Sequence, residues 1–234
     1  MIKISKNKYL YRIVRFDHAV QVLKGALYFS HPSQWEDPYE TRVKHNYDHA
    51  IFAQCWTTAS MSDAMWRIYS PNFLGVRLRT KAGKLAQAMQ AYAQSNKGFQ
   101  IRLEKVNYLR QADYKKEASQ IEALMGDNDF RSPALGADLL CIKRSAFEHE
   151  NEVRAILFDS NAEREEGSVL KSVVVDFSGI DLIDSILFDP RAPDELCHAM
   201  RHYLKDVLGF SGDVRKSKLY TVKSRGDNKN ILGW

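Results

Sequence analysis

The chain has 234 residues, 44% of them hydrophobic, which is enough apolar material for one large folded domain. The formal net charge of +5 is mild, and no apolar run approaches the length that crosses a bilayer, which excludes a membrane-spanning protein. The first residues lack the apolar core of a secretory signal, and the three cysteines form no close pair. We therefore expect a cytoplasmic protein with reduced thiols and no membrane partner.

Hydrophobic periodicity and turn residues predict an alternation of short strands and helices in the first half. Strands are predicted at residues 8–14, 26–30, 51–57 and 73–78, and helices at 16–23 and 60–69. Gly25 is suited to end the first helix, and Ser60 or Ser62 to cap the second. The loop from His31 to Glu40 has two prolines but also aromatic residues, so we expect it to be held against the body of the protein.

The second half contains longer helical patterns. Helices are predicted at residues 81–95, 114–125, 135–143 and 193–208, and strands at 98–108, 153–158, 169–177, 183–189 and 219–222. A turn-rich stretch at 159–167 predicts that the strands on either side of it form a hairpin. The expected fold is a single α+β domain with a mixed or antiparallel β core, peripheral helices and a helical insertion around residues 81–145.

Positive charge is concentrated at the C-terminal end, in a basic tail that spans residues 213–234. Its cations are Arg215, Lys216, Lys218, Lys223, Arg225 and Lys229. Such a tail can follow the phosphates of a nucleic acid or a dinucleotide, but an ordinary solvated tail has the same composition. Both interpretations remain open.

The stretch from Lys143 to Arg154 carries three glutamates at alternate positions directly before an apolar run. If the strand begins early enough to include Glu150, then Glu150 and Glu152 lie on one face of it, because side chains of a strand alternate. Neighbouring carboxylates repel, so a fold that holds them together either pairs them with cations or uses them in chemistry. An ion-pair cluster with the nearby basic residues is the alternative to a catalytic pair.

Other motifs are weaker. His198 and His202 are four residues apart on a predicted helix, but zinc needs three or four ligands and cations flank both histidines, so no metal site is predicted. Trp66 and Tyr69 lie on the short second helix, in the half of the chain that is rich in tyrosine and tryptophan. These rings either stack on a flat ligand or build the core.

Several segments together resemble a known family, the bacterial domain of unknown function 2971, in chain order. They are Leu10 to Arg12, Leu27 to Glu40, Cys55, Met65 to Tyr69 followed by Gly75 and Val76, Lys143 to Arg154, and Ile186 to Ala192. The layout of these segments is similar to the ADP-ribosyltransferase fold, with an opening basic strand, a strand that ends in a small hydroxyl residue, an aromatic helix and a late strand that bears a glutamate.

That resemblance implies an enzyme that uses NAD as a substrate and transfers ADP-ribose to a macromolecular acceptor, with RNA or DNA among the candidates. It implies binding of NAD by the opening strand (Tyr11, Arg12), the second strand (Ser30), the helix aromatics (Trp66, Tyr69) and Arg154, and catalysis by Glu152 with help from Glu150. A role as a toxin, in defence or in housekeeping is open for such an enzyme, and a cognate inhibitor or antitoxin is among its candidate partners.

Two alternatives remain open at this point. In the first, Glu150 and Glu152 hold a divalent metal and the basic tail holds phosphate, as in a nucleic-acid processing or binding protein. In the second, the protein is a non-catalytic interaction module whose acids neutralise Lys143, Arg144 and Arg154.

Overall fold

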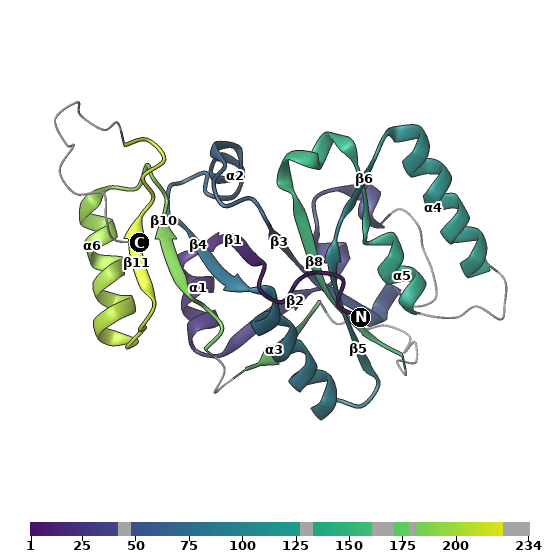
Figure 1. Cartoon of the computed structure of the whole chain (residues 1–234), viewed down its shortest axis with the longest axis horizontal. Coiled ribbons are helices and arrows are strands. Elements are labelled where there is room, and N and C mark those ends of the chain that lie inside the picture. Colours follow the sequence, from purple (N-terminus) through teal and green to yellow (C-terminus); the bar gives the residue numbers. More distant parts are fainter. Residues whose placement is uncertain (42–47, 127–132, 161–170, 178–180, 222–234) are drawn as a thin grey trace.

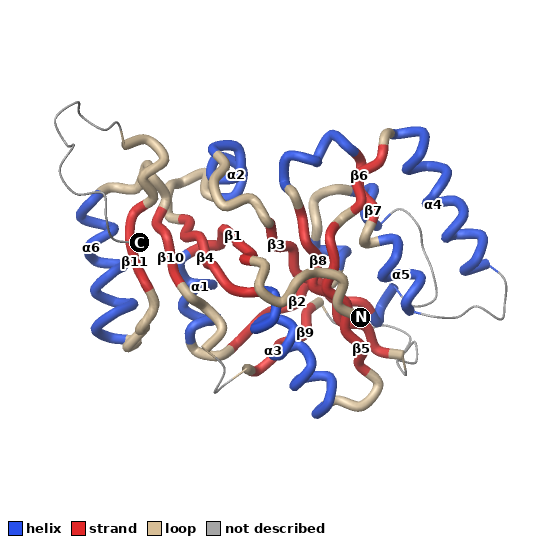
Figure 2. Tube along the Cα trace, viewed as in Figure 1, coloured by secondary structure: helices blue, strands red, loops and turns tan. Residues whose placement is uncertain are grey.

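The computed structural model describes residues 1–41, 48–126, 133–160, 171–177 and 181–221, and its main feature is a forked β-sheet (Figures 1 and 2). The strands of this sheet are β1 (Tyr9–Arg15), β2 (Ala26–Ser30), β3 (Ile51–Thr57), β4 (Gly75–Lys81), β5 (Phe99–Lys105), β8 (Glu152–Asp159), β9 (Ser172–Asp176), β10 (Ser185–Phe188) and β11 (Asp213–Lys216). Within the described residues the order is β11-β10-β4-β1-β3-β2-β9, and β8 and β5 continue from β3. All pairs in this sheet are antiparallel except β10 with β11.

The fork lies at β3. Along one edge, β3 pairs with β8 over its whole length, from Ile51 opposite Phe158 to Thr57 opposite Glu152. On its other edge β1 meets β3 only at Tyr11 opposite Thr57, and β2 meets it at Ser30 opposite Ala53. The arm with β1 and the arm with β2 therefore diverge from the same strand, and residues of β1, β3 and β8 meet where they separate.

Helices cover the sheet and are named in chain order. They are α1 (Phe16–Leu23), α2 (Asp63–Tyr69), α3 (Ala82–Ser95), α4 (Gln111–Gly126), α5 (Pro133–Leu139) and α6 (Asp194–His202), which continues as the π-helical turn η5 (Tyr203–Val207). Short 3-10 turns are η1 (Pro32–Gln34), η2 (Pro38–Thr41), η3 (Asp48–Ala50) and η4 (Ser145–Glu150). None of the helices in the described parts of the chain is long and apolar enough to cross a membrane.

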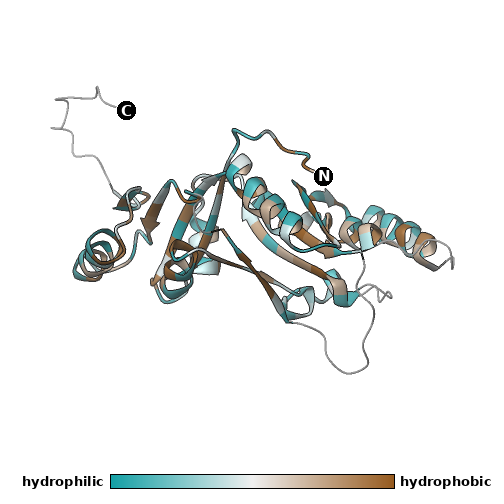
Figure 3. Ribbon diagram, turned by 90° about the horizontal axis from the view of Figure 1, so that it is seen from below, coloured by the Kyte–Doolittle hydropathy of each residue, from teal (hydrophilic) through white to brown (hydrophobic). Residues whose placement is uncertain are grey.

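The principal core lies between one face of the sheet and α1, α3 and α6. It contains Leu10, Leu78 and Phe188 from the strands, and Val22 and Leu85 from the helices. Strand β4 shows how alternation builds it, since Val76, Leu78 and Thr80 are buried and the residues between them are partly exposed. Figure 3 shows long hydrophobic stretches on the strands and mixed polarity on the helices, as expected where each helix buries one side.

A second layer lies at the other end of the molecule, where α4 and α5 accompany a small parallel sheet of β6 (Asn107–Leu109) and β7 (Ile142–Arg144) (Figure 1). Within the range 81–145, which the sequence suggested as a helical insertion, α3 and β5 belong to the main body because β5 pairs with β8. In this layer, β7 places Lys143 next to Glu152, the first residue of β8.

The expected fold class is confirmed: the chain forms a mixed, mostly antiparallel α+β structure with helices around it. The predicted hairpin is wrong, because β9 pairs with β2, from Ala26 opposite Asp176 to Ser30 opposite Ser172, whereas β8 lies between β3 and β5. The stretch proposed as its turn lies mostly in 161–170, outside the described residues.

Several predicted boundaries are shifted by a few residues, and three of the predicted elements differ in kind. The helix predicted at 135–143 ends at Leu139, and its last residues form β7, which hydrogen-bonds to β6. The strand predicted at 98–108 is two strands, separated at Val106. The last strand in the described part of the chain is β11 and not 219–222, where residues 219 and 220 form a turn and residue 222 lies outside the described residues. An edge strand that buries only Val214 gives a weak sequence pattern.

Candidate functional site

The acidic motif folds as a turn followed by a strand. Glu150 ends the 3-10 turn η4, and β8 begins at Glu152, so the prediction that both acids lie in one strand is wrong. Between them, Asn151 adopts the left-handed conformation with φ 45°, which asparagine tolerates better than most residues. The turn at Asn151 therefore brings the two carboxylates together, and the alternation of side chains along a strand does not. Glu148 is exposed, in contrast to both.

The ammonium group of Lys143 lies among three buried carboxylates. Its Nζ is 2.7 Å from Glu150 Oε2, 3.2 Å from Glu152 Oε2 and 3.3 Å from Glu40 Oε1. Burial by itself would lower the pKa of Lys143, but the charges of Glu152 and Glu40 and the hydrogen bond to Glu150 raise it. Lys143 is therefore a permanent cation at the centre of the cluster.

Arg154 neutralises the cluster from the other side and is fully buried. Its Nε donates to Glu152 Oε1 at 2.8 Å, its Nη2 to Glu152 Oε2 at 3.2 Å, and its Nη1 to the Leu140 carbonyl at 2.6 Å. Its Nη2 also reaches Glu40 Oε1 at 2.5 Å, and the Trp35 ring covers the guanidinium at 4.7 Å. Arg154 is thus the counter-ion of Glu152 in this structure, with its donors directed at protein groups.

Glu152 is held in its ionised form by these neighbours. Burial alone would raise the pKa of Glu152, but Arg154, through its charge and its hydrogen bonds, and Lys143 lower it to about 2. The thiol of Cys55, which lies opposite Arg154 on β3, also hydrogen-bonds to Glu152. Burial first, and the charge of Glu152 second, raise the pKa of that thiol well above its usual value. The cysteine is a neutral donor to the carboxylate.

The aromatic helix α2 connects the cluster to the surface. Ser62 caps α2 by accepting a hydrogen bond from Met65 N at 3.3 Å, and the last residue of the helix, Tyr69, donates from its hydroxyl to Glu150 Oε1 at 3.1 Å. Tyr69 is 43% exposed, whereas Trp66 is 1% exposed. Only the Tyr69 ring can therefore meet a ligand from solvent without rearrangement of the helix.

Of the three predicted cofactor residues on the first two strands, only Arg12 lies near Tyr69. Arg12 is partly buried, and burial lowers its pKa while Cys55 and Tyr69 lie near enough to oppose that effect. Tyr11 alternates with Arg12 along β1 and packs under the Arg77 guanidinium at 4.6 Å. Ser30 accepts a hydrogen bond from Trp35 Nε1 at 3.0 Å, so it supports the ring that covers Arg154.

The structure thus brings together Tyr69, Glu150 and Glu152, which come from α2, η4 and β8, and it places Arg12 of β1 near Tyr69 and Cys55. Trp66 is buried and Ser30 supports the Trp35 ring, so neither joins them, and Arg154 is fully buried. Tyr11 lies opposite Thr57, which lies opposite Glu152, so its backbone is next to the site while its ring contacts Arg77.

Sequence reasoning did not identify Glu40, Trp35 and Cys55 as members of the cluster. Glu40 lies in η2, far from β8 in sequence. The only sequence signal for it was its position at the end of the loop that contains two prolines and aromatic residues. That loop is held against the body as expected: Tyr39 stacks on the Arg144 guanidinium at 3.9 Å, and the Tyr39 carbonyl accepts from the Tyr114 hydroxyl at 3.0 Å. Arg144 pairs with Asp37 at 3.2 Å rather than with the acidic motif.

The charge arrangement has a chemical consequence. Three carboxylates meet two cations, so the cluster keeps a net negative charge in a buried setting. Lys143 stands where a divalent metal would have to stand to bind Glu150 and Glu152 together, and the described residues include no group of three side chains placed to hold a metal ion. The cluster is suited to stabilise positive charge that develops next to it.

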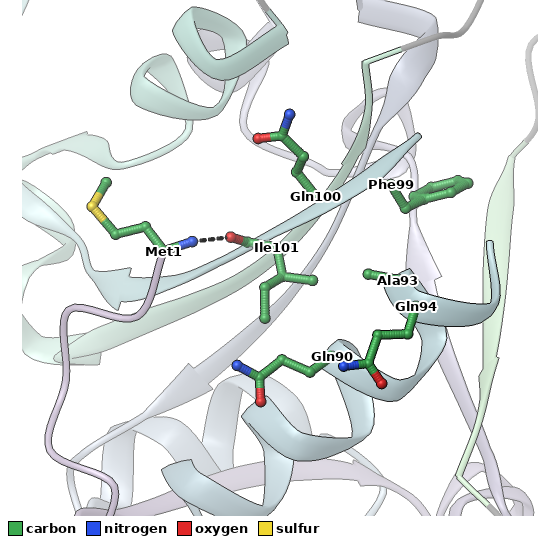
Figure 4. Close-up of a pocket in the computed structure, with 7 residues that line it drawn as sticks. All are labelled: Met1, Gln90, Ala93, Gln94, Phe99, Gln100 and Ile101. Carbon is green, nitrogen blue, oxygen red and sulfur yellow. Dashed lines mark hydrogen bonds between the residues drawn. The ribbon is translucent and has the colours of Figure 1, made fainter. Parts of the chain in front are cut away.

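A separate open pocket of about 450 Å³ lies at the far end of β5 (Figure 4). It is lined by Met1, by Gln90 and Gln94 of α3, and by Gln100 and Ile101 of β5. Because Ile101 pairs with Leu157, five residues beyond Glu152, this pocket is at the opposite end of β8 from the carboxylates. It is not part of the candidate site.

Comparisons with known proteins confirm the family resemblance over part of the chain. Residues 65–155, which contain Tyr69, Glu150 and Glu152, match the family model described as protein of unknown function (DUF2971). A search of curated proteins gives no match.

Among solved structures, DarT of Thermus sp. 2.9 resembles this chain in three complexes. The complex with NAD+ has 14% identity and a TM-score of 0.38, and the complex with carba-NAD+ has 14% identity and a TM-score of 0.39; each match covers 92% of this chain and 98% of DarT. The complex with ADP-ribosylated single-stranded DNA has 13% identity and a TM-score of 0.40, and the match covers 92% of this chain and 96% of DarT.

Proposed function

We propose that the protein is an NAD-dependent ADP-ribosyltransferase that transfers ADP-ribose from NAD to a macromolecular acceptor, with nucleic acid as the favoured class. One observation carries the proposal: Tyr69 from α2 is hydrogen-bonded to Glu150, which shares the Lys143 ammonium with Glu152, at the point where β1 with Arg12 separates from β3. All of these residues lie in the segments that carry the family resemblance, and the two outermost, Arg12 and Glu152, are 140 positions apart in the chain.

The reaction breaks the bond between nicotinamide and ribose, and the electron pair of that bond leaves with nicotinamide. Positive charge then develops on the anomeric carbon, as in glycoside cleavage, and a nearby carboxylate stabilises it only if it is ionised. With a pKa of about 2, Glu152 is ionised at every physiological pH. Glu152 is therefore the stabilising group, and Lys143 and Arg154 are positioning residues that fix it.

Glu150 has the second role. It lies closer to the surface residue Tyr69, and its Oε1 accepts the Tyr69 hydroxyl while its Oε2 contacts Lys143. In the transfer step Glu150 takes the proton of the acceptor nucleophile as the new bond to ribose forms. The half-exposed ring of Tyr69 offers a flat face to nicotinamide.

The cofactor assignment fits the charges around Arg12. No carboxylate among the described residues forms an ion pair with this guanidinium, so it is free to make charge-assisted hydrogen bonds to the NAD pyrophosphate. NAD is a substrate here and no further cofactor is required.

The same contacts also favour a second candidate, a non-catalytic module in which the cluster only stabilises the fold. Glu152 and Arg154 satisfy each other, and truncating one member of a buried ion pair is strongly destabilising whatever the function. The two candidates differ in whether nicotinamide is released.

The deciding experiment measures nicotinamide release and label transfer from adenine-labelled NAD to protein, RNA and DNA. Glu150→Gln is expected to reduce transfer more than release of nicotinamide to water, and Arg12→Gln to raise KM for NAD more than it lowers kcat. Glu148→Gln is the matched control, because this exposed glutamate lies two residues away in the same turn. Absence of release and transfer by the wild type, or unchanged activity of folded Glu150→Gln and Glu152→Gln, would reject the enzyme and leave the module.

A further inference from the structure

The sheet face opposite the main core carries a ladder of alternating cations and tyrosines. On β4 the partly exposed residues are Arg77, Arg79 and Lys81, and on the neighbouring β1 they include Tyr9 and Tyr11. The register fixes their order, because Tyr11 is opposite Arg79 and Tyr9 is opposite Lys81. Side chains in register share one face of a sheet, so these five form one surface.

The members of this ladder contact one another in turn. The Arg77 guanidinium lies 4.6 Å from the centre of the Tyr11 ring, and the Arg79 guanidinium lies 4.9 Å from that of Tyr9. Lys81 Nζ lies 5.8 Å from the Tyr9 ring, which belongs to a residue that is 39% exposed. Strand pairing and cation–π contacts hold the charges and rings in fixed alternation.

The cations of the ladder have no acidic partners among the described residues. The Nε atoms of Arg77 and Arg79 are buried without a hydrogen-bond acceptor, and the nearby acids are engaged elsewhere: Asp213 pairs with Arg215 at 3.0 Å, and Asp184 with Lys84 at 2.7 Å.

The pKa of Arg77 is perturbed mainly by burial, and the neighbouring cations add to the effect. It is lowered to about 10, first by burial and then, despite the opposing effect of Tyr11, by the charges of Arg79 and Arg215. Cations that lie side by side without an acidic partner create a positive field, which attracts an anionic ligand.

We propose that this ladder binds a single-stranded nucleic acid, with the β4 cations on successive phosphates and the Tyr9 ring against a base. Arg77 and Lys81 are four residues apart on a strand, so the cations extend over about 13 Å. A single phosphate or a pyrophosphate would occupy only part of that length, whereas a polyanion can follow all of it. An exposed aromatic ring can stack on the face of an unstacked base, which a single strand offers and a duplex hides.

In the proposed function the ladder would bind the nucleic-acid acceptor, and this role rests on the proposed function. Binding to the ladder does not itself require NAD or the carboxylate cluster, so it is measured separately. Tyr11 connects the two regions, since it follows Tyr9 in the ladder and precedes Arg12 on β1.

The test is fluorescence anisotropy of the full chain with a labelled oligonucleotide of about 12 nucleotides, without NAD, at about 50 and about 200 mM salt. Removing two phosphate contacts in the double variant R77Q/R79Q should reduce the salt slope by about 1.4, so that the wild type loses about sevenfold more affinity than the variant over this range. The control variant K115Q/K116Q removes two exposed cations from α4 and should bind like the wild type.

A second variant tests the ring. Tyr9→Leu should weaken binding by about tenfold, as expected for one lost base stack. Tyr28→Leu is its control, because Tyr28 is a 45% exposed tyrosine on β2. Failure of the wild type to bind, binding by R77Q/R79Q and Tyr9→Leu equal to that of the controls, or equal affinity for duplex or pyrophosphate would overturn the inference. Glu150→Gln should retain full oligonucleotide binding, because Glu150 is not part of the ladder. A wild type that binds the oligonucleotide but releases no nicotinamide and transfers no label would refute only the proposed function.

Discussion

Replacing Glu152 by glutamine removes one negative charge from the buried cluster and keeps nearly the same shape. Two hydrogen bonds from Arg154, at 2.8 and 3.2 Å, and one from Lys143, at 3.2 Å, end on this carboxylate. The substitution leaves those cations with less compensation. We expect a loss of stability that depends on pH in a specific way.

The magnitude follows from the pKa of Glu152. Holding it at about 2 in the folded protein, against an ordinary value of 4.5, contributes about 3 kcal/mol to the free energy of unfolding at neutral pH. Because the folded pKa is the lower one, this contribution is complete above pH 4.5 and disappears as the pH falls toward 2. At pH about 3.5 it is reduced to about 2 kcal/mol.

The assay is urea unfolding of the wild type and Glu152→Gln at neutral pH and at pH about 3.5. The difference in unfolding free energy should be about 3 kcal/mol at neutral pH and about 2 kcal/mol at pH about 3.5. Groups that titrate alike in both proteins cancel in this difference. A difference below about 0.5 kcal/mol at neutral pH, or one that stays constant with pH, would refute the claim that the ion pairs hold Glu152 ionised.

Three further substitutions test the supports of the site. Ser62→Ala removes the cap of α2 and should lower the unfolding free energy by about 1 kcal/mol in urea titrations and raise KM for NAD through Tyr69; no change in either would contradict the role of the cap. Trp35→Leu removes the ring over Arg154 and the hydrogen bond to Ser30, and should cost about 2 kcal/mol by the same measurement, whereas an unchanged midpoint would show that the ring contributes nothing. Because φ of Asn151 is 45°, Asn151→Gly should have the same unfolding free energy as the wild type or a slightly higher one, and Asn151→Ala should lower it by about 1 kcal/mol. Equal effects of the two substitutions in thermal unfolding would argue against left-handed strain.

Local patterns in the sequence were sufficient for most individual elements. The helix 16–23 and the strands 26–30 and 51–57 were predicted with the boundaries that the structure has. Their signals are short-range: Gly25, with φ 95°, ends the helix, and the apolar run of β3 is buried on both faces. The α+β class followed from the same alternation of periods.

Partners of these elements could not be predicted in the same way. The run 169–177 read as the return strand of a hairpin with β8, yet β9 pairs with β2 because that edge of the sheet was open to it. Edge strand β11 was missed because a charged strand that buries one valine has no clear period.

The candidate site shows the same division between sequence and structure. Sequence by itself marked the acidic motif, the aromatic helix and Arg12 as chemically unusual, through residue type and the family resemblance. Only the tertiary structure decided that Tyr69 contacts Glu150, that Glu40 joins the cluster and that Arg154 is a counter-ion rather than an exposed ligand. Helix and strand patterns arise between residues a few positions apart, whereas the contact between Glu40 and Arg154 joins residues that are 114 positions apart. The entropic cost of closing such a long loop changes only slowly with its length, so sequence separation does not select which segments meet. The burial and strand pairing of the whole fold select them.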